Sequence, residues 1–176
     1  MLALVSLSGW SAHARAQSVA SALELQVKAA YLYKFAGYTE WPEGSFAQSD
    51  SALLIGVAGH DALAGQLELV VAGRSINGHP LTVRRLKRGD SPAGLHILCT
   101  SAADRSAMIE LLGQARALPI LTVADDADGL AHGAMIAFLM AQDRLRFDVG
   151  LKPVNQARLR ISARMLAVAH QVQGAT

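Results

Sequence analysis

Two groups of side chains in this sequence have the types and spacing that molecular recognition requires. The stretch VKAAYLYKFAGYTEWP, residues 27–42, holds five of the nine aromatic residues of the chain. Near the carboxyl end, arginines follow one another at short intervals in ARLRISARM, residues 157–165. Aromatic residues and arginine are enriched where proteins bind partners. We therefore predict that one binding surface is drawn from Tyr31, Lys34, Phe35, Tyr38, Trp41, Arg146, Arg160 and Arg164.

Each group also has a simpler explanation. Aromatic residues at helical spacing are usually core residues, and arginines on a terminal helix usually face water. The sequence leaves both explanations open for both groups.

Catalytic and metal-binding patterns are absent from the sequence. It has no G-x-x-x-x-G-K-[ST] loop, no G-x-S-x-G elbow and no G-x-G-x-x-G after a strand. The six histidines include no i, i+4 pair, and ADDADG lacks the carboxylates that a calcium loop needs at its first and last positions. The turn GVAGHD offers backbone amides to an anion, but an ordinary turn is the favoured interpretation. We predict no catalytic residue, no metal and no cofactor.

Composition and length indicate one well-packed domain. The chain has 176 residues, is 52% hydrophobic and carries a net charge of +2. No run of basic residues exceeds the pair Arg84-Arg85, so nucleic acid is not an expected partner.

The first residues resemble an export signal. An apolar run over residues 2–10 is followed by Ala14-Arg15-Ala16, a small-x-small cleavage pattern. We expect cleavage after Ala16, which leaves residues 17–176 as a single domain with no membrane span. Cys99, the single cysteine, lies in an apolar segment and is expected to be buried and unreactive.

The apolar patterns define the elements of a fold. Residues 19–38 predict a helix that is apolar over more than half of its circumference. Apolar strands over residues 52–59, 81–86, 95–100 and 119–125 alternate with helical patterns, which favours parallel pairing. Residues 134–151 predict a hairpin, followed by a short helix near 154–158 and a longer one over 162–172. We predict a three-layer α/β domain with a roughly six-stranded mixed sheet, helices on both faces and a C-terminal hairpin and helix, assembled as a homodimer.

Several stretches together resemble the YfiR family, defined by the DUF4154 domain. They are VKAAYLYKFAGYTEWP, GRSINGHPLTVRRL, HILCTS, PILTVAD, GAMIAFLMAQDRLRFDVGL and ARLRISARMLAVA, in the order and spacing of that family. The resemblance implies a periplasmic, non-enzymatic regulator that binds and represses the periplasmic domain of an inner-membrane diguanylate cyclase. Cyclic di-GMP and biofilm formation would then fall, and an OmpA-like outer-membrane lipoprotein could sequester the repressor.

A second hypothesis is a periplasmic small-molecule sensor. In it, Tyr31, Phe35 and Trp41 would stack on a ring, and Arg160 or Arg164 would pair with an anion.

The chain departs from the family pattern at positions that bear on stability. Gly56 and Leu95 stand where family members often carry two cysteines, and Ala137 and Gly150 stand where they carry asparagines. We therefore expect stability that does not depend on a disulfide.

Overall fold

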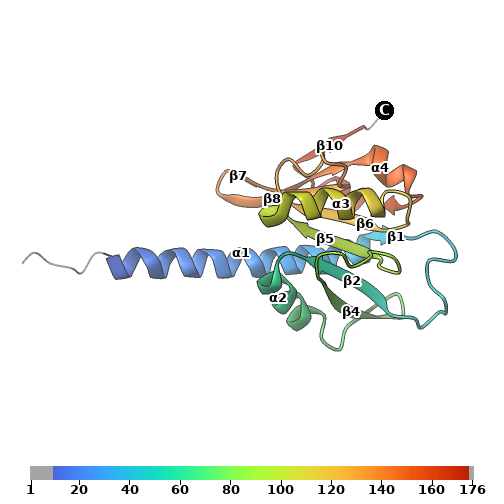
Figure 1. The fold of residues 1–176 in the computed structure, drawn as a ribbon, viewed down its shortest axis with the longest axis horizontal. Coiled ribbons are helices and arrows are strands. Elements are labelled where there is room, and N and C mark those ends of the chain that lie inside the picture. Colours follow the sequence, from blue (N-terminus) through green and yellow to red (C-terminus); the bar gives the residue numbers. More distant parts are fainter. Residues whose placement is uncertain (1–9, 175–176) are drawn as a thin grey trace, which may run out of the picture.

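The computed structural model describes residues 10–174, which form an eight-stranded mixed sheet with helices on both faces (Figure 1). The strand order is β10-β8-β7-β6-β5-β2-β4-β3, and a separate two-stranded ladder joins β1 to β9. The strands of the large sheet are β2 (Leu53–Ala58), β3 (Ser75–Ile76), β4 (His79–Leu86), β5 (Ile97–Ser101), β6 (Leu121–Asp125), β7 (Ile136–Ala141), β8 (Arg144–Gly150) and β10 (Gln171–Gln173). The predicted α/β class is confirmed, and two short edge strands enlarge the sheet.

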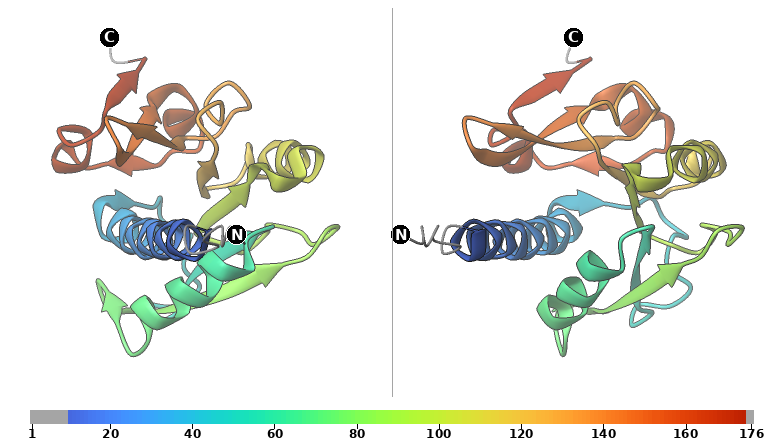
Figure 2. Two further views of the ribbon diagram at one scale, coloured as in Figure 1. Left: turned by 90° about the vertical axis from the view of Figure 1, so that its left-hand side faces the viewer. Right: turned by 60° about the vertical axis from the view of Figure 1, so that its left-hand side comes forward.

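Helices cover the two faces of the sheet unequally. The helices are α1 (Trp10–Tyr38), α2 (Asp61–Val71), α3 (Arg105–Ala115), α4 (Leu151–Gln156) and α5 (Ala163–Leu166). The largest hydrophobic cluster joins residues of α1, α2, α4 and α5 to one face, whereas α3 packs on the other face in two smaller clusters. Figure 2 shows α1 and α3 on opposite sides of the sheet.

Strand alternation explains why both faces are apolar. In β2, Leu53, Ile55 and Val57 belong to the cluster under α1 and α2, while Leu54 and Ala58 pack toward α3. Five neighbouring strands, from β4 across to β7, pair in parallel, and buried parallel strands read as continuous apolar runs. The β7–β8 hairpin then pairs antiparallel, as the sequence predicted.

The helix α1 extends beyond the body of the domain. Its inner face buries Ala29, Leu32, Phe35 and Ala36, and its first turns project away from the sheet (Figure 1). The expected cleavage position after Ala16 falls in this projecting part, while residues 1–9 of the expected signal lie outside the described residues. Export with cleavage stays a prediction.

The predicted long helix over residues 162–172 is wrong. The helix α5 ends at Leu166, and β10 then pairs in parallel with the end of β8. Two hydrogen bonds fix this edge: the His170 amide donates to the Phe147 carbonyl and His170 Nδ1 contacts Asp148 Oδ1, each at 2.9 Å. A helix over these residues would have no apolar surface to pack against, since Val168 of the expected apolar face is 60% exposed.

Gly56 and Leu95 touch in the core on the α3 side of the sheet. A Cβ atom added to Gly56 would lie 2.4 Å from Leu95 Cδ1 and 2.7 Å from Leu86 Cδ1. Leu95 therefore occupies the space that a side chain at position 56 would need.

Cys99 is 1% exposed in the centre of β5, and its predicted burial is confirmed. Burial raises the pKa of the Cys99 thiol far above its usual range, so the thiol stays protonated and unreactive.

Candidate functional site

The aromatic residues of α1 divide between the core and the surface. Tyr31 and Phe35 pack on Phe138 and Phe147 of the hairpin, with ring centroids 5.0 to 6.0 Å apart. Phe35 is 1% exposed, so its ring is not available to a partner in this structure. The simpler explanation therefore holds for Phe35, and Tyr31 is half-buried beside it.

A two-stranded ladder brings the end of α1 to the C-terminal arginines. The strands β1 (Thr39–Glu40) and β9 (Arg160–Ile161) pair antiparallel, with Glu40 opposite Arg160. The Ser162 amide donates a hydrogen bond to the Tyr38 carbonyl at 2.9 Å. Ser162 is also the N-cap residue of α5, the helix that packs on α1 and carries Arg164. We call four exposed residues of this region, Lys34, Tyr38, Arg160 and Arg164, the junction surface, and exposed Glu40 borders it opposite Arg160.

The junction surface carries unpaired positive charge. Among the described residues, Lys34, Arg160 and Arg164 form no ion pair. Tyr38 beside them is 39% exposed. Three cations without ion-pair partners and an exposed aromatic residue in one region suit the binding of an acidic protein surface.

Arg146 lies apart from the other predicted site residues. It belongs to β8 opposite Leu139, and it alternates with Phe147, whose ring faces α1. The Arg146 side chain therefore points from the face of the sheet opposite to α1.

Trp41 joins a different set of rings, which we call the edge cluster: Trp41, Phe46, His79 and His96. Phe46 stacks between His79 and His96, at centroid distances of 3.8 and 4.2 Å. The Trp41 indole donates from Nε1 to the His96 carbonyl at 3.2 Å. Trp41 stacks with the edge cluster, whereas Phe35 is buried against Phe138 and Phe147, so this structure does not present the two rings on one open surface. Small-molecule binding by the predicted residues stays a hypothesis.

His96 is held in its neutral form by backbone groups on both sides of the ring. The Leu54 amide donates to Nδ1 at 3.1 Å, and Nε2 donates to the Ser45 carbonyl at 3.0 Å. Burial, aided by nearby His79, lowers the pKa of His96 in spite of the hydrogen bond to Ser45.

Buried charges occupy the opposite, carboxyl-terminal edge of the sheet. Lys28 of α1 is 7% exposed and lies 2.7 Å from Asp125 Oδ1 at the end of β6, with Glu24 on its other side. Burial alone would lower the pKa of Lys28, but hydrogen bonds to Asp125 and Glu24 outweigh burial and raise it. His60 approaches the second Asp125 oxygen at 3.6 Å.

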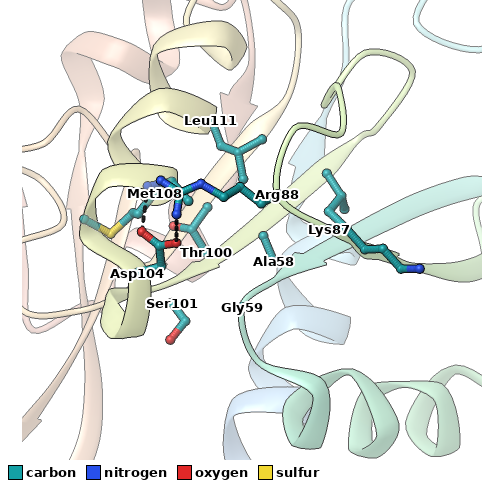
Figure 3. A pocket seen from close by; sticks show the side chains of 11 residues that line it. Ala58, Gly59, Lys87, Arg88, Thr100, Ser101, Asp104, Met108 and Leu111 are labelled. Atoms are coloured by element: carbon teal, nitrogen blue, oxygen red, sulfur yellow. Dashed lines mark hydrogen bonds and ion pairs between the residues drawn. The ribbon is translucent and has the colours of Figure 1, made fainter.

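A small cavity also lies at this edge, where the chain switches from one face of the sheet to the other. It measures about 130 Å³ between the ends of β2 and β5 and the first turn of α3 (Figure 3). Arg88 crosses it to Asp104 at 3.1 Å, while Lys87 points away. Ligands of open α/β sheets favour this position, but this cavity is smaller than the one of about 150 Å³ that admits benzene.

Sequence reasoning missed Phe46, His79 and His96, although a signal for the histidines was present. His79 is the first residue of β4, and His96 directly precedes β5. Parallel strands begin at the same edge of a sheet, so two histidines at strand starts are brought together. Phe46 lies in a loop and carries no comparable signal.

A family model described as YfiR/HmsC-like (DUF4154) matches residues 25–170. The chain belongs to the YfiR/HmsC-like family. Domains of this family are regulatory and non-catalytic, are periplasmic in general and act in diguanylate cyclase signalling. No curated protein matches the chain.

Two further properties concern residues 10–174 alone. No helix there is both long and apolar enough to cross a membrane. Among the side chains that the structure describes, those of residues 19–174, no group of three or more histidine, cysteine or acidic residues is arranged to hold a metal ion.

Proposed function

We propose that this YfiR/HmsC-like protein binds the periplasmic domain of an inner-membrane diguanylate cyclase and holds the enzyme inactive. Membership of the family supports a role in this signalling system. The observation that carries the proposal is the junction surface, where Lys34, Arg160 and Arg164 have no ion-pair partner among the described residues and Tyr38 on the same region of α1 is exposed. The partner surface is expected to be acidic, since complementary charge steers association.

The repressor is expected to act without catalysis and without a cofactor. An OmpA-like outer-membrane lipoprotein that covers the junction surface would release the cyclase. Self-association as a homodimer stays a prediction, and the junction surface must remain accessible in such a dimer.

The test uses deletion of the gene and complementation. Deletion should raise cyclic di-GMP and biofilm formation, and the wild-type gene should restore both. The double variant Arg160→Glu/Arg164→Glu should fail to restore them, because like charges would face the acidic partner. The matched control is Arg84→Glu/Arg144→Glu, which reverses two exposed arginines without ion pairs on other parts of the molecule.

Binding in vitro separates loss of contact from loss of protein. The purified periplasmic domain of the cyclase should bind the site variant at least about tenfold more weakly than the control, a difference of about 1.4 kcal/mol. Affinity for wild type should fall with added salt. Equal complementation by the site and control variants, at equal protein levels, would exclude the junction surface.

A further inference from the structure

A cleft opens between the end of α1 and the β3–β4 turn, beside the edge cluster. Its volume is about 220 Å³. One wall comes from the end of α1, β1 and the loop that follows, and the other from β2, β3 and the start of β4. The lining residues are Ala36, Thr39, Glu40, Trp41, Phe46, Leu53, Ile76, Asn77 and His79.

The aromatic wall of the cleft is rigid before any ligand arrives. Phe46 is fixed by stacking on both faces, and the Trp41 indole is fixed by its hydrogen bond to the His96 carbonyl. His79 Nδ1 lies 2.8 Å from the Ser51 carbonyl, which can only accept, so Nδ1 is the donor. A wall held in place in this way loses little entropy on binding.

The charge of the lining selects the sign of the ligand. Glu40 is the single formally charged residue that lines the cleft, and it forms no ion pair among the described residues, although Arg160 lies opposite it across the ladder. Aromatic rings together with a carboxylate are the groups that recognise an organic ammonium ion. A cavity of about 150 Å³ admits benzene, so this larger cleft has room for a trimethylammonium group and a short hydroxylated chain.

We propose that this cleft binds a small organic ammonium compound, with the cationic head against Trp41 and His79 and close to Glu40. Phe46, whose two faces are covered by His79 and His96, supports the wall and does not contact the cation. The proposal does not rest on cyclase binding, although Glu40 of this cleft lies opposite Arg160 of the junction surface.

Choline is the probe, and 3,3-dimethylbutan-1-ol is its neutral isostere of the same shape. Choline is titrated into the full chain, and binding is followed by calorimetry and by the NMR signal of the Trp41 indole N–H. The Trp41→Leu variant lacks this signal and so identifies which of the two indole signals belongs to Trp41 and which to Trp10. Choline should bind with a Kd on the order of 1 mM or lower. The neutral isostere should bind at least about tenfold more weakly, because it lacks the charge that the rings and Glu40 recognise.

Exposed charge variants test the site without risk to folding. Glu40→Gln should weaken choline binding several-fold, and Arg160→Gln should strengthen it, because the opposing charge is removed. Arg84→Gln should leave it unchanged. Equal binding of choline and the isostere, an unmoved Trp41 signal up to about 100 mM choline, or no effect of Glu40→Gln would each overturn the proposal.

Discussion

At the amino-terminal edge of the sheet, Trp41, His79 and His96 of the edge cluster hydrogen-bond to backbone groups, and His96 is buried as a neutral ring. At the carboxyl-terminal edge, Lys28 is buried as a cation between Asp125 and Glu24. Loss of a neutral hydrogen bond costs the desolvation of one polar group, whereas loss of an ion partner leaves a charge uncompensated. The comparison therefore predicts that the two edges differ in mutational sensitivity and in pH response.

The largest expected effect is at the carboxyl-terminal edge. Asp125→Leu should lower the free energy of unfolding by about 3–5 kcal/mol, because Lys28 keeps only the half-exposed Glu24. The double variant Lys28→Met/Asp125→Leu should recover most of this loss, since it buries no charge. Urea unfolding measures both, and a double variant no more stable than the single one would contradict this account.

A smaller loss is expected at the amino-terminal edge. His96→Leu leaves the Leu54 amide and the Ser45 carbonyl without partners, which should cost about 2–3 kcal/mol. His79→Leu removes one hydrogen bond, to Ser51, and should cost about 1 kcal/mol. If the two substitutions were equally costly, the two-sided hydrogen bonding of His96 would not be its main contribution.

The two edges should lose stability at opposite ends of the pH scale. The pKa of His96 is lowered from 6.5, so the unfolded chain binds its proton more readily, and stability falls as pH drops below 6.5. The pKa of Lys28 is raised from 10.5, so its contribution is complete below 10.5 and is lost as pH rises through the folded-state pKa.

Thermal midpoints across pH test this difference. His96→Gln should reduce the fall of the thermal midpoint at acid pH and leave its fall at alkaline pH as in wild type. Lys28→Met should do the reverse. A variant that flattened both sides, or neither, would show that other groups dominate.

The smallest expected effect is that of a reducing agent. Cys99 is buried and is the single cysteine, so reductant should leave the thermal midpoint unchanged and no disulfide-linked dimer should form. The Gly56→Cys/Leu95→Cys variant is the positive control, because a bridge closing a loop of about forty residues contributes on the order of 4 kcal/mol. A wild-type midpoint that falls by several degrees would refute the expectation.

The sequence predicted the parts of the molecule that depend on local pattern. The parallel strands, the hairpin and the burial of Cys99 follow from apolar periodicity. The junction surface depends on the backbone pairing of β1 with β9, which places Glu40 opposite Arg160, 120 positions further along the chain, and local patterns do not report such contacts. The same holds for Lys28 and Asp125, which meet because α1 spans the sheet from edge to edge.

The segment after Leu166 shows the other limit of sequence reasoning. Its apolar spacing suits a helix, but the open edge of β8 offers hydrogen bonds that a solvated helix end lacks, and β10 forms instead. Secondary-structure propensity alone does not include hydrogen bonding to the open edge of β8.

The contact between Gly56 and Leu95 also constrains the order in which these positions can change during evolution. With Leu95 in place, even a methyl group at position 56 would force Leu95 and Leu86 out of their packing. A smaller residue at position 95 must therefore come first, and the intermediate then carries a cavity. The path toward a paired side chain at both positions passes through a less stable protein, so glycine at position 56 tends to persist once leucine is fixed at 95.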